Sequence, residues 1–486
     1  MLFNSYIFVF LFFPLALAGY YTLNHFHLYR ASSIFLTGMS LWFYGYFNPS
    51  YLLIICGSIA VNYLISQMMI RSGQEYLRRF SLILGICGNV AVIFYFKYFN
   101  FFLENVNSVF GKSFELRNIV LPLGISFFTF QQISYLVDSY RGETKGYSFD
   151  EYALFVSFFP QLIAGPIVLH NEMIPQFRQK EKRRFIPKNF SKGMYIFSLG
   201  LFKKVIIADT FGKAVSYGFG TIDTLSSMEA LITSLSYTFQ LYFDFSGYCD
   251  MAIGIGHMFN IELPQNFNSP YKSASITEFW DRWHMSLTRF LKTYIYIPLG
   301  GNRKGKIRTY INIMVVYLVS GIWHGANWTF ILWGVLHGFL SCLNRLFHKS
   351  WEKLGNITQW ALTFLTVNIL WVFFRADNIQ SAIAFIKQMF TLSSFKIHKD
   401  FYQCFNLPEF KFFEKQIPFL NYLPAKITGF HLWLFIFGAF FIVLNFRNSR
   451  EIEFQPNIRT SLTTIIFTVW SVMSFAGIST FLYFNF

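Results

Sequence analysis

One histidine lies in an otherwise uncharged stretch and is of a type that can do proton chemistry. The 36 residues from Thr309 to Asn344 contain no Asp, Glu, Lys or Arg, and His324 lies near their middle. An imidazole has an ordinary pKa of about 6.5, so it can accept a proton from a hydroxyl near neutral pH. A general base is therefore one interpretation of His324. The other, equally supported by the residues alone, is a core histidine bonded to a backbone carbonyl.

The stretch around His324 must break if it crosses a membrane. As one straight helix it would be about 54 Å long at ~1.5 Å per residue, whereas a hydrocarbon core is about 30 Å thick. The weakest helix-forming segment is Gly325 to Asn327, directly after the histidine. Non-helical backbone at membrane depth survives only where protein or a water-filled cavity covers it. The sequence therefore predicts that His324 faces a protected cavity.

A second histidine, His284, lies in the amphipathic segment that precedes this stretch. At about 100° per residue, the apolar side chains share one arc and the charged ones share the opposite arc. This pattern predicts a helix from Phe279 to Tyr294 with His284 on the margin between the arcs. Asp281 faces the polar side, where we expect it to be solvated or paired with Arg282 or Arg289.

Two further polar residues could belong to a site, but each has a plainer interpretation. Asp244 lies between aromatic residues in an apolar segment, with Asp250 six residues later. A carboxylate at such depth is costly, so it either pairs with a Lys or Arg or serves function. His337 follows His324 by 13 residues, about 20 Å along a continuous helix, which favours separate locations. The histidines lack the close spacing of zinc ligands, so we expect no metal site.

The composition indicates a polytopic membrane protein. Hydrophobic residues make up 54% of the 486 residues, charged residues only 13%, and Phe alone numbers 65. This is too much apolar sequence for one soluble core. The net charge of +16 arises from short Lys and Arg clusters between apolar runs, as in cytoplasmic loops, and does not indicate nucleic-acid binding.

The apolar runs predict about twelve membrane crossings. If the basic clusters are cytoplasmic, the N-terminus lies outside, and residues 152–169 must dip into the membrane and return at Pro160 and Gly165. The same topology places Thr391 to Thr428 outside. The predicted crossings are, approximately, 5–24, 32–48, 50–69, 81–103, 119–138, 193–211, 228–256, 310–323, 328–344, 357–375, 428–446 and 463–484.

Six motifs in this order resemble one known family. They read FFPQLIAGP, YFDFSGYCDMAIG, LPQNFNSPY, FWDRWHMSL, YIPLGGNRKG and SGIWHGANWTFILWGVLHG. The chain is similar to the membrane-bound O-acyltransferase (MBOAT) family, in the bacterial branch of alginate and peptidoglycan O-acetylation proteins. The core motifs span about 43–377. The remainder, 378–486, holds the C-terminal helices and the outer segment of a single membrane-embedded domain, 1–486.

The resemblance implies an all-α fold, a ring of about 11–12 tilted transmembrane helices with re-entrant segments around a central funnel and tunnel. It implies transfer of an acyl group, here acetyl, from a cytoplasmic thioester such as acetyl-CoA towards an extracytoplasmic polysaccharide, with no bound cofactor. The near-invariant histidine of the family maps onto His324 and a second one onto His284, which would orient the donor, polarise the thioester carbonyl or cap the tunnel. Residues expected to bind donor or substrate are Trp323, Asn327, Trp328, Asp281 and Asp244.

Two alternatives to polysaccharide O-acetylation stay open. The same fold could deliver D-alanine to teichoic acid, or the His and Asp residues could form the relay of a transporter or flippase. Transporters often show repeated halves with matched broken helices, whereas this sequence has one such break and no repeat. The expected partners are membrane lipid and an extracytoplasmic acetyltransferase protein, and the expected location is the cytoplasmic membrane.

Overall fold

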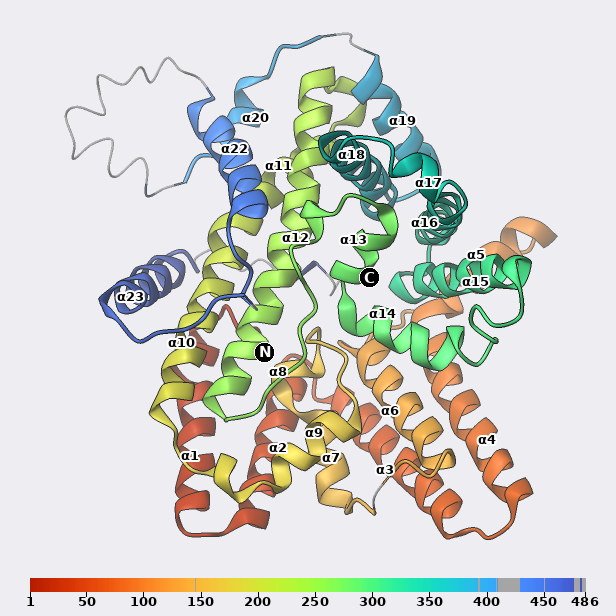
Figure 1. Cartoon of the computed structure of the whole chain (residues 1–486), viewed down its shortest axis with the longest axis vertical. Helices are drawn as coiled ribbons and strands as arrows, with labels where there is room; N and C mark the ends of the chain where they lie inside the picture. The colour runs from red at the N-terminus through yellow and green to blue at the C-terminus, as the bar shows by residue number, and fades with distance from the viewer. Residues whose placement is uncertain are drawn as a thin grey trace.

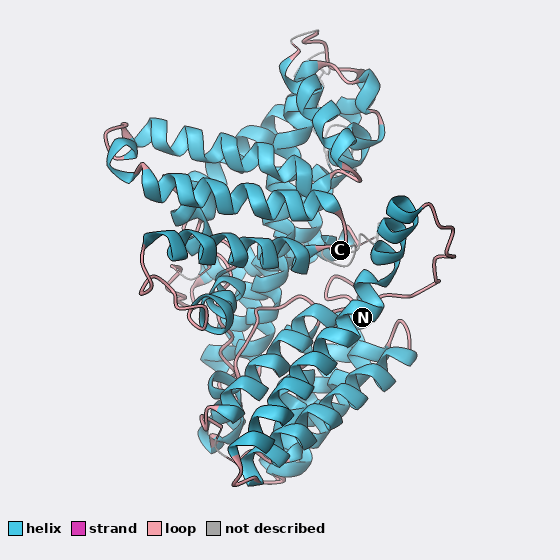
Figure 2. Ribbon diagram, turned by 90° about the vertical axis from the view of Figure 1, so that its right-hand side faces the viewer, coloured by secondary structure: helices cyan, strands magenta, loops and turns pink. Residues whose placement is uncertain are grey.

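The structure, a computed structural model, describes residues 1–144, 146–391, 394–407, 409, 429–449, 451–475 and 481–482. Within these ranges every regular element is a helix, and the only β contact is an isolated bridge between Phe267 and Trp283. Figure 2 shows the same all-helical composition. The predicted all-α fold is thus confirmed for the described residues.

The chain forms its helices in three consecutive groups. The first comprises η1 (Phe8–Phe12), α1 (Phe13–His25), α2 (Tyr29–Gly45), α3 (Ser50–Arg71), α4 (Glu75–Ile93), η2 (Phe94–Tyr98), α5 (Phe99–Phe110), α6 (Ile125–Tyr140), α7 (Phe149–Ser157), α8 (Phe159–Leu162), α9 (His170–Arg178) and η3 (Lys180–Arg183). The second comprises α10 (Pro187–Phe202), η4 (Lys203–Ala208), α11 (Asp209–Gly220), η5 (Ile222–Thr224), α12 (Ser227–Met258), η6 (Pro270–Lys272), α13 (Ile276–Arg282), α14 (Met285–Leu291) and η7 (Lys292–Tyr296). The third comprises α15 (Lys306–His324), α16 (Trp328–Leu346), α17 (His348–Trp351), α18 (Asn356–Arg375), α19 (Ile379–Phe390), α20 (Lys399–Gln403), α22 (Phe430–Asn445) and α23 (Ile458–Met473).

Helix α12 runs through the middle of the molecule, with α1 to α4 and α6 to α9 towards one end and α16 to α19 towards the other (Figure 1). Nearly all of its 32 residues are buried, and α10 and α11 pack along it. Glycines allow the closest approach, because a Cβ on Gly193 would lie 2.5 Å from the carbonyl oxygen of Gly254. The central helix is thus the core element against which α10, α11 and α18 pack.

Among the described residues, four helical spans are long and apolar enough to cross a membrane. They are Phe8–His25, Ser50–Arg71, Glu75–Phe110 and Asn356–Arg375, and the shorter helices Phe430–Asn445 and Ile458–Met473 are apolar as well. The other predicted crossings also coincide with helices, but these do not meet both criteria. The predicted crossing at 119–138 begins later in the structure, because residues 112–124 lie outside any helix and α6 begins at Ile125; α19 is a further helix that was not among the predicted crossings.

The segment expected to dip into the membrane is broken as its prolines suggested. Helix α7 ends at Ser157, and the four-residue α8 begins at Phe159 with Pro160 in its first turn. Residues 152–168 are buried throughout.

The segment expected outside, Thr391 to Thr428, is only partly described. Residues 392–393, 408 and 410–428 lie outside the described residues, so its location stays a prediction.

Candidate active site

The predicted break after His324 is confirmed. Helix α15 ends at His324, Gly325 is extended, and α16 begins at Trp328. A side chain at residue 325 would meet the ring of Phe330, since a Cβ there would lie 2.2 Å from a ring carbon. Gly321 and Gly334 let α15 and α16 pack closely on either side of the break: a Cβ on Gly334 would lie 2.5 Å from the Tyr317 carbonyl oxygen.

Aromatic rings surround the His324 side chain, which is only 3% exposed. The centroid of its imidazole lies 4.9 Å from that of Trp323, 5.2 Å from Trp333 and 5.1 Å from Phe374. These residues come from α15, α16 and α18, so three helices fix the position of the ring. The ring is thus enclosed by aromatic side chains and fixed in position by three helices, which suits a positioned base.

The second histidine lies at a second helix break, which the sequence did not predict. The amphipathic segment is not one helix: α13 ends at Arg282, α14 begins at Met285, and His284 between them is left-handed, with φ 44°. Non-glycine residues rarely adopt this conformation. As a result His284 is fully buried instead of lying on the margin of a continuous surface helix.

Hydrogen bonds from Asn266, in the LPQNFNSPY motif, hold the break at His284. The backbone N–H of Met285 donates to the carbonyl oxygen of Asn266 over 3.0 Å. The side-chain oxygen of Asn266 accepts from the Ser286 N–H over 3.2 Å and from its hydroxyl over 2.6 Å. The Ser286 hydroxyl in turn accepts from the N–H of Ile167 over 2.9 Å. Sequence reasoning missed both Asn266 and Ser286 as contributors to the site.

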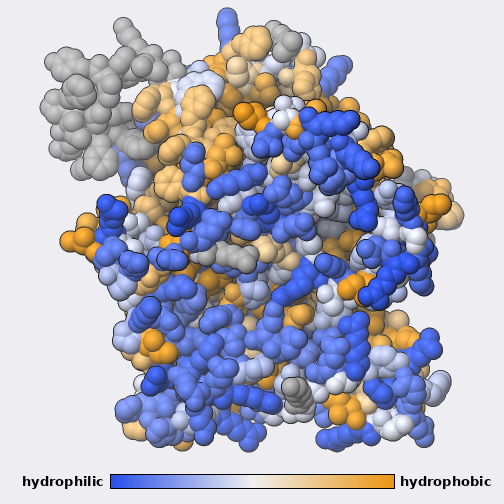
Figure 3. Space-filling view, viewed as in Figure 1, coloured by the Kyte–Doolittle hydropathy of each residue, from blue (hydrophilic) through white to orange (hydrophobic). Residues whose placement is uncertain are grey.

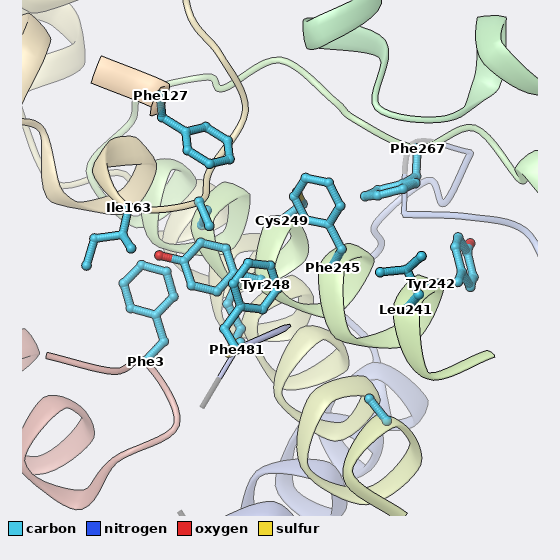
Figure 4. Close-up of a cluster of buried hydrophobic side chains, with 14 of the residues drawn as sticks. Phe3, Phe127, Ile163, Leu241, Tyr242, Phe245, Tyr248, Cys249, Phe267 and Phe481 are labelled. Carbon is cyan, nitrogen blue, oxygen red and sulfur yellow. The ribbon is translucent and has the colours of Figure 1, made fainter. Parts of the chain in front are cut away.

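The two breaks bring the two histidines together, 40 residues apart in sequence. Their ring centroids are 6.4 Å apart, and Trp323 lies beside both, 5.9 Å from His284. Phe245 of α12 packs edge-on against His284 at 4.8 Å, and Phe127 of α6 lies at 6.5 Å. Figure 4 shows the Phe127 and Phe245 side chains approaching one another from their two helices.

A small cavity adjoins His324. Its volume is about 30 Å³, and its lining includes Lys97, Ser126, Phe127, Trp323 and His324. A water molecule needs roughly 10–15 Å³ by this measure, so the space suits about two waters or a small group. The cavity therefore matches a short acyl group better than a long chain.

Lys97 was missed in the sequence, although it lies in the apolar run FYFKYFNFF. Its ammonium donates to the carbonyl oxygens of Trp323 and His324 over 2.7 and 3.0 Å. The hydroxyl of Tyr98 donates to the carbonyl oxygen of Ile322 over 2.5 Å. These are the last carbonyls of α15, which have no partner within the helix. A single basic residue in a long apolar run was the available signal.

His337 is closer to His324 than its sequence spacing suggested, because the break folds α16 back along α15. Trp333 lies between them, 5.2 Å from His324 and 4.8 Å from His337. The Nδ1 atom of His337 accepts from the indole N–H of Trp280 over 3.1 Å. His337 therefore belongs to the aromatic surroundings of the site. In the described part of the chain, no three His, Cys, Asp or Glu side chains are grouped to hold a metal ion.

Asp244 and Asn327 have structural partners. Asp244 pairs with Lys204 over 2.6 Å, and Lys204 also contacts Asp209 over 2.8 Å. This is the pairing that its depth suggested. Asn327 caps α16: its side-chain oxygen accepts from the Thr329 N–H over 3.0 Å, and its amide donates to the Asp377 carbonyl.

Trp328 and Asp281 point away from the two histidines' buried surroundings. Trp328 is 53% exposed, and its indole N–H donates to Asn105 over 2.9 Å. Asp281 is exposed, as the solvated alternative predicted, whereas Arg282 pairs with Glu278 and Arg289 with Glu172. Of the expected binding residues, only Trp323 contacts both histidines.

Comparison with known proteins places this chain in a family. Residues 79–383 match the membrane-bound O-acyltransferase family, MBOAT. The chain is 41% identical to a peptidoglycan O-acetyltransferase of Helicobacter pylori, over 100% of this chain and 98% of that protein. It is 40% identical to a probable alginate O-acetylase of Pseudomonas aeruginosa, over 82% of this chain and 76% of that protein. It is 26% identical to a teichoic acid D-alanyltransferase of Bacillus subtilis, over 49% of this chain and 62% of that protein. The chain therefore belongs to the membrane-bound O-acyltransferase family, and it is an O-acyltransferase.

Proposed function

We propose that this protein takes acetyl groups from a cytoplasmic thioester and passes them on for the O-acetylation of an extracytoplasmic polysaccharide, with His324 as general base. The observation that carries this proposal is the meeting of two histidines at two helix breaks, 6.4 Å apart beside a small cavity. Both histidines lie within the part of the chain that matches the family. His284 is the second contributor, facing the acyl group from the other side.

The reaction follows from the chemistry of a thioester and a hydroxyl. The hydroxyl oxygen attacks the acyl carbonyl carbon while His324 accepts its proton. The carbonyl π electrons move to the oxygen, forming a tetrahedral anion. When the anion collapses, the carbon–sulfur bond breaks and the leaving thiolate takes the proton back from His324. Each atom and charge is then accounted for, and the imidazole returns to its neutral form.

Peptidoglycan is the acceptor that the comparisons favour. The peptidoglycan O-acetyltransferase matches this chain along its whole length, whereas the probable alginate O-acetylase leaves about a fifth of it unmatched. The teichoic acid D-alanyltransferase matches only half, which makes D-alanyl transfer the weaker alternative. An extracytoplasmic acetyltransferase partner would complete the transfer to the polymer.

The proposed location is the cytoplasmic membrane, with the helices ringed around a funnel and tunnel. Hydrophilic residues cover much of the face seen in Figure 3, as expected of a surface that meets water. Four exposed cations have no carboxylate partner among the described residues: Arg303 and Lys304 in the loop before α15, and Lys306 and Arg308 in its first turn. On the cytoplasmic side these cations would attract the phosphates of acetyl-CoA.

The test is acetyl incorporation from labelled acetyl-CoA in membranes that contain the His324 variants. We expect His324→Ala to lower the rate by roughly 10²–10⁴, the usual contribution of a general base. His324→Asn should be nearly as inactive, because an amide accepts no proton near neutral pH. His348→Asn, which changes an exposed histidine, is the matched control. Wild-type rates in both His324 variants would refute the general-base role, and export of unmodified substrate without incorporation would favour a transporter.

A further inference from the structure

A lysine lies where a charged side chain is costly. Lys97 belongs to the apolar span Glu75–Phe110, the longest of those able to cross a membrane among the described residues. A lysine near the centre of such a span costs about 2.5–3.5 kcal/mol on insertion scales, so it is usually retained for function. Lys97 also lies in the π-helical segment η2, and π-bulges are frequent at functional sites.

The contacts of Lys97 all point to the break after His324. Its ammonium donates to the carbonyl oxygens of Trp323 and His324, and the Ser126 hydroxyl lies 3.5 Å away. In the described part of the chain, no carboxylate lies within ion-pair distance of Lys97. The groups around the ammonium are two carbonyl oxygens, the Ser126 hydroxyl and the Tyr98 ring, all of them neutral, so its charge is available to a negatively charged group in the adjoining cavity.

Capping the helix end does not by itself require a charge. Tyr98, the next residue, caps the Ile322 carbonyl with a neutral hydroxyl. An ammonium has three N–H donors, and two of those on Lys97 are used by the two carbonyls. The third is directed to the Ser126 hydroxyl over a long 3.5 Å, and Ser126 lines the same cavity as Lys97 and His324. The cation and the candidate base therefore line one small cavity.

We propose that Lys97 stabilises the negative charge that develops on the acyl carbonyl oxygen during transfer. The inference rests on the proposed function and adds a catalytic residue to it. When the hydroxyl attacks and His324 takes its proton, the carbonyl electron pair moves to the oxygen beside the Lys97 ammonium. When the thiolate leaves, the pair returns to the carbonyl, so Lys97 neither gains nor loses a proton. Positioned donors of this kind contribute roughly 10²–10³ in kcat.

The experiment separates the charge of Lys97 from its capping bonds. Lys97→Gln keeps an amide donor without the charge, Lys97→Arg keeps the charge, and Tyr98→Phe removes only the neighbouring cap. Each variant is assayed for kcat and KM of acetyl transfer from labelled acetyl-CoA in membranes, normalised to the amount of protein.

We expect Lys97→Gln to lower kcat by about 100-fold with little change in KM. Lys97→Arg should retain more activity than Lys97→Gln, and Tyr98→Phe, which removes one cap and leaves the charge of Lys97 in place, should lose less activity than Lys97→Gln. If Lys97→Gln turns over as fast as the wild type, or loses no more than Tyr98→Phe, the residue is only a cap and the proposal is wrong. If Lys97→Gln accumulates poorly, the same comparison is made with kcat calculated per molecule of inserted protein.

This result can be separated from a failure of the proposed base. Full activity of His324→Asn would remove the histidine from the mechanism. A kcat defect confined to Lys97→Gln would still assign the lysine to the reaction.

Discussion

The amide of Asn266 should determine whether His284 reaches the site. Its side-chain oxygen accepts two hydrogen bonds from Ser286, and both groups are buried. Asn266→Ala removes that acceptor and leaves the Ser286 N–H and hydroxyl without it, while the backbone bond to Met285 remains. A buried polar group left unsatisfied costs about 1–3 kcal/mol. The Ser286 hydroxyl keeps its bond from Ile167, so we expect a loss of about 2–4 kcal/mol in stability.

Loss of these bonds should affect activity as well, because they hold His284 in its left-handed conformation. That conformation costs about 1–2 kcal/mol for a non-glycine residue, so the backbone would relax once released. A displacement of about 1 Å at a reacting group can lower the rate roughly 100-fold. We therefore expect Asn266→Ala to lower acetyl transfer by at least about 10-fold.

The assay combines thermal unfolding of the purified protein in detergent with acetyl transfer in membranes. The matched control is Asn268→Ala, two residues further along the same segment, whose side chain accepts from Asn448 instead. In a double-mutant cycle, Asn266→Ala and Ser286→Ala should be non-additive by about 1–3 kcal/mol. Additive effects, or equal loss of activity in Asn266→Ala and Asn268→Ala, would show that the amide does not position His284.

Other variants test the surroundings of the site. Gly325→Ala places a methyl group against the Phe330 ring, so we expect reduced acetyl transfer and a lower melting temperature. Asp244→Asn should destabilise the protein by about 1–3 kcal/mol in a thermal unfolding assay, because Lys204 loses its fully buried carboxylate partner and keeps Asp209. Recovery of stability when Lys204→Met is added would support the pairing, and no effect of either change would contradict it. Trp328→Ala should retain near wild-type transfer, since this exposed indole does not face the histidines.

The break at Gly325 was predictable because it followed from lengths and residue types alone. A 36-residue uncharged stretch cannot cross a bilayer as one helix, and the segment Gly325 to Asn327 has the weakest tendency to form a helix. Pairing of Asp244 was likewise expected from the cost of a buried carboxylate. Both conclusions follow from the local sequence and the properties of a lipid bilayer. Neither requires knowing which distant segments contact one another.

The break at His284 could not be predicted in this way. Apolar residues recur at helical spacing on both sides of it, so the sequence pattern is that of one continuous helix. The burial of these residues in the structure agrees with that pattern. The interruption comes from Asn266, which lies on another segment and competes for the backbone of Met285 and Ser286. A hydrogen bond between distant segments has no periodicity, and a left-handed histidine has no sequence signature comparable to glycine.

Both histidines lie at helix ends, and this explains why residues distant in sequence determine their positions. Each lies where a helix stops, so its backbone neighbours need partners from outside their own helix. At His324 these partners are Lys97 and Tyr98, more than 220 residues earlier, and at His284 the partner is Asn266. In a membrane, water cannot replace such partners. Changes in η2 or in the LPQNFNSPY motif should therefore act directly on the geometry of the site.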